Sequence, residues 1–519
     1  MLFLGLDLGS SSAKASVIDA ESGDVVAAAH YPEAEMPIDS EFEKWAEQDP
    51  DIWWSCCIQA SRKAFMAAGI NSKNIAGVGI AYQMHGLVMV DENNELIRPA
   101  IIWCDSRAQK QGDCLAEAVG NNYCSDNLLN RPANFTSSKL LWIKENEPEN
   151  FARCKKILLP GDYIAMRLSG DVTTTASGLS EAILWDFKEK SISTPMLEAL
   201  GIDASLMPDL VPSIGLQGRV NREAASAMGL RVNTPLCYRA GDQPNNAFSL
   251  NVAKAGEVAA TAGTSGVIYG IKNLETKHGA SESAADSGNR VNTFLHVNAD
   301  NDHSEAGILL CVSGAGRAYS WLRSILNTTQ SAPSYDQMNA MAASVGIGSE
   351  GLQFYPFGNG AERLLENKPY AAQLQNLDFN RHDLSHIVRA TQEGVAYSFA
   401  MGFEVFTQLA TKAKTIRVGR NNLFLSDSFS QVFCGLTDCP LEFYDTDGAT
   451  GAARGAALGF GFYETHQQAF ISLKPLSRLE PDRRRQAEYE DAFAQWKLGF
   501  PTLISEPDSV SSLTNAPAS

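Results

Sequence analysis

The sequence predicts an α/β protein built from two related lobes around a cleft. Its 519 residues exceed what one hydrophobic core usually holds, so two or more domains are expected. Strand-like and helix-like segments alternate along the chain, as in a sheet covered by helices. A strand, a Gly/Ser/Thr turn and a second strand open the chain at residues 2–18, and this pattern returns at residues 256–270. Two halves that begin alike indicate a repeated architecture.

The first half contains the segments of a mixed, covered sheet. Residues 25–29 extend the opening hairpin, and residues 50–69 have the apolar spacing of a helix. Residues 75–81 predict a buried strand. Residues 88–91 and 96–103 predict two further strands.

Four segments organise the rest of the chain. Residues 215–235 contain glycines and a proline and predict the connection between the halves. Residues 389–411 predict a long helix with one apolar side, and residues 487–498 predict a closing helix. Residues 505–519 are polar and contain proline, so we expect a disordered tail.

The composition narrows the class of protein. A net charge of −18 argues against a surface for nucleic acid or anionic membranes, so any phosphate site must be local. No apolar stretch is long enough for a transmembrane helix, and the N-terminus lacks the basic region of a signal peptide. The ten cysteines are scattered without a CxxC pair, which is typical of reduced core thiols. We therefore expect a cytoplasmic enzyme.

The tip of the opening hairpin has the chemistry of a phosphate loop. Gly9 allows a close approach of backbone to a ligand, and Ser10, Ser11 and Ser12 add donors. Lys14, on the returning strand, is predicted to bind the nucleotide with them. A carboxylate beside such a turn, here Asp7, suits a hydrated Mg²⁺. An ordinary Gly-Ser hairpin is the alternative, since short glycine-rich motifs occur by chance.

Several further motifs, together with this hairpin, resemble the FGGY family of carbohydrate kinases and within it the xylulose kinases. They follow one another in the family's order over about residues 1–465. The motifs lie at residues 45–50 with 53–54, 83–86, 103–107, 159–163, 241–242, 263–266 and 447–457.

The resemblance implies two ribonuclease-H-like lobes of the actin, sugar kinase and Hsp70 type around a nucleotide cleft. It also implies ATP and Mg²⁺ as cofactors and a homodimer. The domains expected are an N-terminal sugar-binding lobe (1–248), a C-terminal nucleotide-binding lobe (249–465), a closing helical extension (466–504) and the tail (505–519).

Asp242 matches the family's catalytic aspartate, which accepts the proton of the sugar hydroxyl. Its position before a short helix also suits a helix cap, and this is the structural alternative. The next residue, Gln243, replaces an asparagine that is common in xylulose kinases. A sugar contact is nevertheless predicted there.

The resemblance places sugar binding at Gln83, Met84 and His85, where polar side chains follow a strand. Trp103 either stacks on the sugar or packs in the core. Asp105 is predicted to line a polar pocket, with an ion pair to Arg107 as the alternative. A core histidine is the alternative for His85.

In the second half, Gly263, Thr264 and Ser265 resemble the second phosphate loop, and Gly316 belongs to a segment that borders the nucleotide in related kinases. The chain departs from the family at residues 418–422, where a Gly-Gly-Gly turn usually supports adenine and ribose. Only Gly419 is retained, and Asn can adopt the left-handed conformation of glycine. We therefore expect nucleotide contacts at Gly419, Asn421 and Asn422.

The function expected from the resemblance is ATP-dependent phosphorylation of D-xylulose. Another sugar of the family (gluconate, ribulose, fuculose or rhamnulose) is the first alternative. A non-catalytic sugar- or nucleotide-binding regulator of the same fold is the second, and an actin- or Hsp70-like ATPase is the third.

Overall fold

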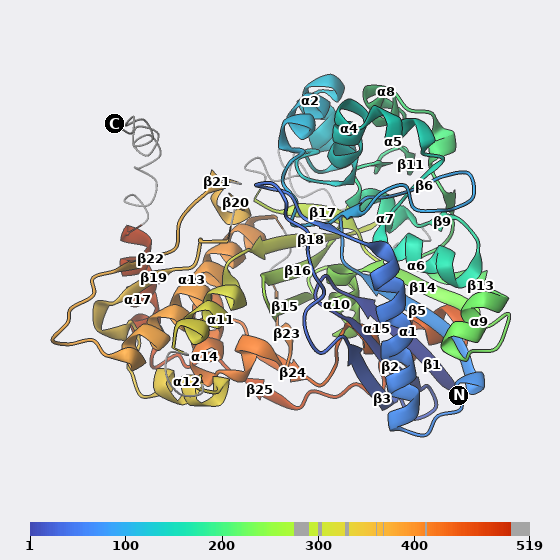
Figure 1. Ribbon diagram of the computed structural model, residues 1–519. Helices are drawn as coiled ribbons and strands as arrows, with labels where there is room; N and C mark the ends of the chain where they lie inside the picture. Colours follow the sequence, from blue (N-terminus) through green and yellow to red (C-terminus); the bar gives the residue numbers. More distant parts are fainter. Residues whose placement is uncertain are drawn as a thin grey trace, which may run out of the picture.

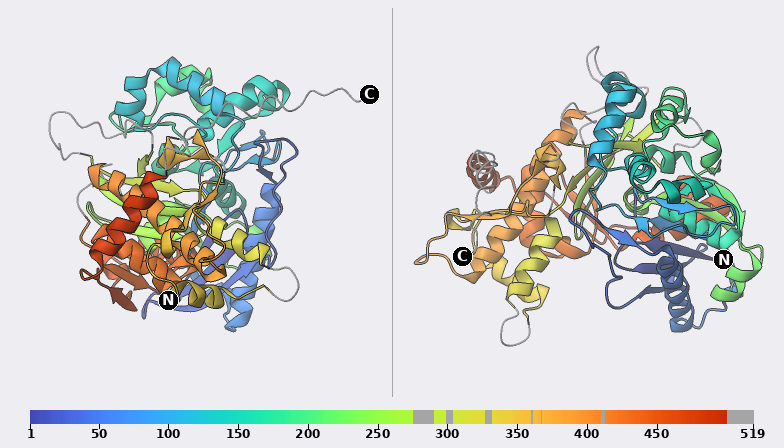
Figure 2. Two further views of the ribbon diagram at one scale, coloured as in Figure 1. Left: turned by 90° about the vertical axis from the view of Figure 1, so that its left-hand side faces the viewer. Right: turned by 45° about the horizontal axis from the view of Figure 1, so that its top comes forward.

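The computed structural model describes residues 1–274, 290–298, 304–326, 332–359, 361–366, 368–409 and 413–499. These residues form two lobes, each built on one mixed β-sheet (Figure 1). The blue-to-green elements of the first half lie together, and the yellow-to-orange helices between residues 315 and 437 lie on the other side of the molecule (Figure 2). The two-lobed α/β architecture predicted from the sequence is confirmed.

The first sheet has the strand order β13-β14-β5-β1-β2-β3. Its central strand β1 pairs antiparallel with β2 and parallel with β5, so the predicted opening hairpin is present. The strands are β1 (Leu2–Leu8), β2 (Ala13–Asp19), β3 (Asp24–Tyr31), β5 (Ile75–Tyr82), β13 (Ile214–Arg219) and β14 (Pro235–Gly241).

The second sheet repeats this order around its own hairpin, as β17-β18-β16-β15-β23-β24-β25. The strand β15 pairs antiparallel with β16 and parallel with β23, just as β1 pairs with β2 and β5. The strands are β15 (Val258–Ala262), β16 (Gly266–Asn273), β17 (Asn292–Leu295), β18 (Glu305–Val312), β23 (Ile416–Gly419), β24 (Leu441–Tyr444) and β25 (Ser477–Leu479).

Short paired strands lie outside the two large sheets. They are β4 (Glu47–Gln48) with β7 (Ala100–Ile101), β6 (Val88–Val90) with β8 (Lys156–Leu158), β9 (Thr173–Thr174) with β12 (Asp209–Leu210), β10 (Trp185–Asp186) with β11 (Ser191–Ile192), β19 (Gln353–Tyr355) with β22 (Gln373–Gln375), and β20 (Ala361–Glu362) with β21 (Lys368–Pro369).

Helices cover both sheets (Figure 1). Those of the first half are α1 (Pro50–Ala67), α2 (Gln109–Val119), α3 (Asn121–Tyr123), α4 (Thr136–Asn146), α5 (Pro148–Arg153), α6 (Pro160–Ser169), α7 (Ala176–Glu181), α8 (Thr194–Leu200), α9 (Arg222–Met228) and α10 (Asp242–Ser249). Those of the second half are α11 (Ala315–Ile325), α12 (Tyr335–Ala343), α13 (Leu384–Leu409), α14 (Asp427–Thr437), α15 (Gly448–Phe460), α16 (His466–Ala469) and α17 (Gln486–Leu498). None of the described helices is both long and apolar enough to cross a membrane.

Helix α15 joins the two lobes. It follows β24 of the second sheet but packs against β1, β5 and β14 of the first. A Cβ added at Gly5 would lie 1.9 Å from the carbonyl oxygen of Ala449, and one at Gly79 would lie 2.1 Å from that of Ala452. Glycines in the strands and small residues in the helix therefore allow their backbones to approach closely.

Two expected segments differ in the structure. Residues 215–235 are not a connection between lobes, because β13, α9 and the start of β14 complete the first sheet. Within residues 96–103, only β7 is a strand, and it pairs with the two-residue strand β4.

The predicted tail at 505–519 lies outside the described residues. All ten cysteines are unpaired, as expected.

Candidate active site between the lobes

Asp242 lies where the first sheet meets the second lobe. It is the first residue of α10 and directly follows Gly241, which ends strand β14 of the first sheet. Helix α10 packs against α15 and against β15 and β16, so the residues at its start lie beside both lobes. The Gln243 side chain and backbone amides in this first turn donate hydrogen bonds to the Asp242 carboxylate.

The Asp7 carboxylate lies close to Asp242. Asp7 is the last residue but one of β1, and its Oδ2 atom is 3.9 Å from Lys14 Nζ on the neighbouring strand. A Cβ added at Gly448 would lie 2.5 Å from Asp7 Oδ2 and 3.2 Å from Oδ1 of Asn246, which is one helical turn after Asp242. Gly448 is thus needed at this point, because any larger residue would fill the space beside the Asp7 carboxylate.

Burial and like charge change the titration of both acids. Burial first and the charge of Asp7 second raise the pKa of Asp242 to about 7, although hydrogen bonds from Gln243 oppose the shift. Burial also raises the pKa of Asp7, against the favourable charge of Lys14, and the Asp447 carboxylate adds to the increase. A carboxyl group whose pKa lies near neutral pH suits a general base.

The residues around Asp7 fit a magnesium–nucleotide complex. Among the described residues, no three His, Cys, Asp or Glu side chains converge on a point that could hold a metal ion. A Mg²⁺ ion that keeps several waters needs only one or two carboxylates together with substrate phosphates. The narrow space that Gly448 leaves open beside Asp7 Oδ2 agrees with such a role.

The first predicted phosphate loop is a tight turn that is held by backbone hydrogen bonds. The amide of Gly9 donates to the carbonyl of Ser12 at 3.0 Å, and the Ser11 carbonyl accepts from the amide of Met36. The Gln48 side chain donates to the Ser10 carbonyl at 2.8 Å. The backbone of the loop is therefore fixed, while the Ser11 side chain stays exposed to solvent.

The second predicted phosphate loop is bound to the start of a helix. The carbonyls of Gly263 and Thr264 accept from the amides of Gly316 and Arg317, in the first turn of α11. A Cβ added at Gly316 would lie 2.1 Å from the Gly263 carbonyl oxygen, so this contact needs glycine. Thr264 itself is exposed, and the side chain of Ser265 hydrogen-bonds with Cys311.

The divergent turn after β23 lies next to this second loop. Asn422 adopts the left-handed conformation with φ 52°, so asparagine takes a place where glycine is usual. Its Nδ2 atom donates to Oδ1 of Asn421 at 3.0 Å and would lie 3.7 Å from a Cβ at Gly263. Arg420, Asn421 and Asn422 are exposed. The structure thus brings Gly263, Gly316, Asn421 and Asn422 to one surface.

His85 has a strained backbone and a partly buried ring. Its φ is 62°, which is unusual for a non-glycine residue, and buried Lys139 Nζ holds its carbonyl oxygen at 2.8 Å. Its Nδ1 atom lies 3.1 Å from the carbonyl oxygen of Glu181. Burial lowers the pKa of His85 well below its usual value, and the Lys139 charge lowers it further. Since a carbonyl can only accept, Nδ1 carries the proton and Nε2 is left as an acceptor.

The other predicted sugar-side residues surround this histidine. Gln83 is buried, and its Nε2 donates to Gln48 Oε1 at 3.2 Å. Met84 lies against Gly241, where an added Cβ would be 2.6 Å from Met84 Cγ. Trp103 is 38% exposed and its indole N–H points to Ser10 Oγ at 3.4 Å, so it does not pack in the core.

Asp105 is fully engaged by protein donors. Its Oδ2 atom accepts from the Ala46 amide at 2.6 Å and from Arg107 Nε at 2.8 Å, and its Oδ1 accepts from the Arg107 amide. The side chain has no exposed surface. This geometry matches the ion-pair alternative, because the carboxylate orders the loop and has no free oxygen for a ligand.

Sequence reasoning missed Glu181, which lies between His85 and Asp242. Its Oε1 accepts from the Tyr82 hydroxyl at 2.6 Å, and its Oε2 would lie 3.1 Å from a Cβ at Gly241. Burial raises the pKa of Glu181 well above its usual value, with Asp242 adding to the shift. No local pattern marks this residue, since it closes the short helix α7 and reaches the site only through folding.

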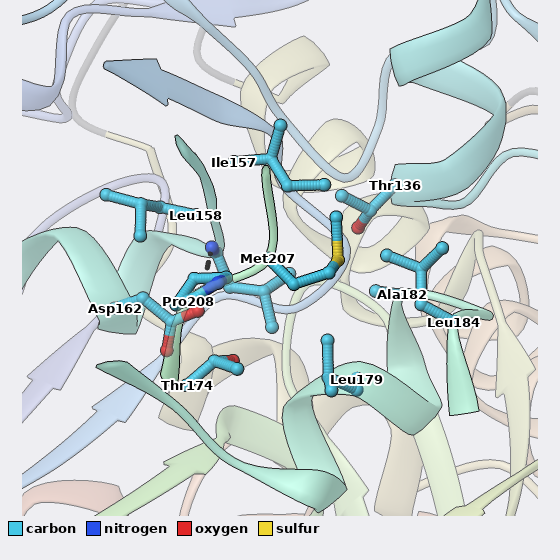
Figure 3. Close-up of a pocket in the computed structure, with 11 residues that line it drawn as sticks. Thr136, Ile157, Leu158, Asp162, Thr174, Leu179, Ala182, Leu184, Met207 and Pro208 are labelled. Carbon is cyan, nitrogen blue, oxygen red and sulfur yellow. Dashed lines mark hydrogen bonds between the residues drawn. The ribbon is translucent and has the colours of Figure 1, made fainter. Parts of the chain in front are cut away.

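A small apolar cavity of the first lobe is separate from this site (Figure 3). Its volume is about 10 Å³, and leucine and isoleucine side chains form much of its lining. Asp162 lines it but accepts from the Leu159 amide at 3.1 Å and pairs with Arg239. The 159–163 motif therefore has a structural role, as the start of α6.

Comparisons with known proteins agree with this geometry. The N-terminal domain of the FGGY family of carbohydrate kinases matches residues 2–249. The chain is 28% identical to a xylulose kinase of Escherichia coli (strain K12) over 495 residues, which cover 94% of this chain and 96% of that protein.

Solved structures show the same fold over nearly the whole chain. A xylulose kinase from Rhodospirillum rubrum superposes with a TM-score of 0.82 at 22% identity, covering 97% of this chain and 99% of the other. A gluconate kinase from Lactobacillus acidophilus gives 0.84 at 19% identity, covering 97% and 98%. Residues 2–249 of this chain thus form an N-terminal domain of the FGGY family of carbohydrate kinases, and the whole chain has the fold of these solved sugar kinases.

Proposed function

We propose that this protein transfers the γ-phosphoryl group of ATP to D-xylulose, giving D-xylulose 5-phosphate and ADP, with Asp242 as the general base. The observation that carries the proposal is the position of Asp242 at the start of α10, with a pKa raised to about 7 beside Asp7. The similarity to the xylulose kinase of E. coli supports the choice of sugar.

The residues of the chain divide the work of phosphoryl transfer. Such a reaction depends on positioning and on neutralising charge, with a carboxylate accepting the proton of the attacking hydroxyl. Asp242 takes this proton, and Asp7 holds the hydrated Mg²⁺. The loops at Gly9–Ser12 and Gly263–Ser265 offer amides and hydroxyls to phosphate oxygens.

The sugar lies against the first lobe in this proposal. The unprotonated Nε2 of His85 accepts a hydrogen bond from one sugar hydroxyl, and Gln83 and the exposed face of Trp103 complete the contacts. Gln243 orients the base, since its side chain already donates to the Asp242 carboxylate. Asp105 holds the loop that carries Trp103.

A substrate panel tests the function. ADP release is measured with saturating ATP and Mg²⁺ for D-xylulose, ribulose, fuculose, rhamnulose and gluconate, and we expect the highest kcat/KM for D-xylulose. Preference for another sugar would replace the substrate. No sugar-dependent ADP release by the folded protein would favour a binding regulator. Steady ADP release that no sugar stimulates would instead favour an actin- or Hsp70-like ATPase.

Two further features belong to the proposal. We infer a homodimer that acts in the cytoplasm. Light scattering after size-exclusion chromatography tests the dimer, with a mass of one 56.1 kDa chain as the contrary result. Fractionation of cells of the source organism tests the location.

A further inference from the structure

A short segment of the second lobe reaches the sugar side of the first. Residues 361–366 follow β19 and carry Glu362, Arg363 and Leu364. Glu362 is buried, and its Oε2 accepts from the amide of Ser313 at 2.9 Å, at the end of β18. Leu364 is buried in the core of the second lobe. Both neighbours of Arg363 are thus fixed to the second lobe.

The Arg363 side chain crosses to the first lobe. Its guanidinium carbon lies 5.1 Å from the ring centroid of Phe135, which is a cation–π contact. The Phe135 ring is 4.7 Å from the His85 ring and 6.0 Å from that of Phe294. The guanidinium therefore lies beside the aromatic wall that surrounds the predicted sugar histidine.

Arg363 also lies near the second phosphate loop. It interacts electrostatically with Cys311, whose side chain hydrogen-bonds with Ser265. Its positive charge contributes to lowering the pKa of His85. The guanidinium thus lies near enough to both His85 and Cys311 to act on them electrostatically.

The N–H groups of the Arg363 guanidinium are available to donate hydrogen bonds to a ligand. Among the described residues, the Arg363 guanidinium has no hydrogen-bond acceptor and no ion pair, although it can donate five hydrogen bonds. Burial lowers the pKa of Arg363 to about 10, so it remains charged at neutral pH. A partly buried cation without a hydrogen-bond partner is costly, and a ligand that accepts hydrogen bonds would remove that cost.

We propose that Arg363 is a substrate-binding residue that donates hydrogen bonds to the sugar from the second lobe. The inference rests on the proposed function, because it needs a sugar beside His85. His85 Nε2 and Asp242 both accept hydrogen bonds, so they recognise hydroxyl protons. A ketose carbonyl oxygen can only accept, and Arg363 supplies the donors that this group needs.

The test compares Arg363→Met with Arg363→Lys in the full chain. Calorimetry gives Kd values for ADP and for the sugar that the unmodified enzyme phosphorylates best. Loss of a charged hydrogen bond should weaken sugar binding by about 10- to 100-fold in Arg363→Met and less in Arg363→Lys. The Kd for ADP should stay within about twofold. Arg381→Met is the matched control, since Arg381 is exposed and pairs with Glu350 on the same lobe.

Each outcome decides the inference. Equal sugar Kd values in Arg363→Met and the unmodified enzyme would overturn it, including the case where only kcat falls and the residue acts on the phosphoryl group instead. Unfolding curves must show that both variants are folded. If Arg363→Met does not fold, the sugar Kd of Arg363→Lys is compared with that of the unmodified enzyme instead. If the unmodified enzyme phosphorylates no sugar of the panel, the proposed function fails and the inference fails with it.

Discussion

At the scale of single residues, Asp242 and Asp7 are coupled by burial and like charge. The Asp242 carboxyl has a pKa near 7 because its site is poorly hydrated and because the Asp7 charge opposes a second negative charge. This coupling gives both a pH profile and a stability effect. Each of these can be measured.

The pH dependence of kcat/KM should show an acid limb. The base works only when deprotonated, so kcat/KM should rise with pH and level off above a pKa near 7. Measurements with both substrates far below KM report the free enzyme. In Asp7→Asn the limb should move to lower pH, because one negative charge is removed. An unmoved limb in that variant would show that Asp7 does not set this pKa.

Asp242→Asn should lower activity and raise stability. Turnover should fall by about 10²- to 10⁴-fold, while sugar and ADP still bind in calorimetry. The pKa of Asp242 is raised from 3.8 to about 7 on folding, so the folded state holds more protons between these values. The free energy of unfolding therefore falls as pH rises through this range.

Asp242→Asn removes this loss of unfolding free energy at high pH. The Tm of the variant should therefore exceed that of the unmodified protein at pH 8. The two Tm values should converge near pH 4. Near-normal turnover in Asp242→Asn would mean that Asp242 only helps to start α10. A lower Tm at pH 8 would contradict the stability argument separately.

His85→Ala should act on sugar binding alone. A site that hydrogen-bonds a hydroxyl loses affinity when the acceptor is removed, so KM for D-xylulose should rise by about tenfold or more. KM for ATP should stay unchanged. Initial-rate kinetics with each substrate varied in turn separate the two constants. If the sugar KM does not change, the sugar binds elsewhere.

At the scale of elements, α15 shows why small residues recur between residues 448 and 457. The helix lies on the first sheet at backbone contact, with Gly5 and Gly79 as the matching positions in β1 and β5. The hydroxyls of Ser16 in β2 and Thr450 in α15 are 3.1 Å apart and join the same elements. The family-like motif at residues 447–457 thus has a packing role.

Gly79→Ala should destabilise the protein measurably. The new Cβ would lie 2.1 Å from the carbonyl oxygen of Ala452, so backbone must move, and overpacking of this kind costs about 1–3 kcal/mol. Gly346→Ala is the control, because no atom lies within 4 Å of its Cβ position. Urea unfolding of both variants gives the comparison. Equal midpoints would show that α15 can shift freely.

At the scale of the whole molecule, the two sheets share one order around their hairpins, and α10 and α15 connect them. Two lobes joined in this way can close on bound substrates, which phosphoryl transfer needs in order to exclude water. Small-angle scattering should show a smaller radius of gyration with sugar and a non-hydrolysable ATP analogue together. An unchanged radius would contradict closure.

The sequence alone determined the architecture and the local chemistry of the loops. Apolar periodicity and Gly/Ser/Thr turns act over a few residues, so the hairpins at Leu2–Asp19 and Val258–Asn273 and the helix Pro50–Ala67 were predictable. The family motifs marked Asp242 and His85 because those residues stand in recognisable local order. Both lie near Glu181 in the structure.

Only the tertiary structure decided which side chains are free to bind. Asp105 lies in a good motif, yet its oxygens are used by Ala46 and Arg107. Glu181 and Arg363 lie in no motif that the sequence marked, yet both reach His85. Hydrogen-bond satisfaction and burial depend on residues distant in the chain, so local patterns cannot report them.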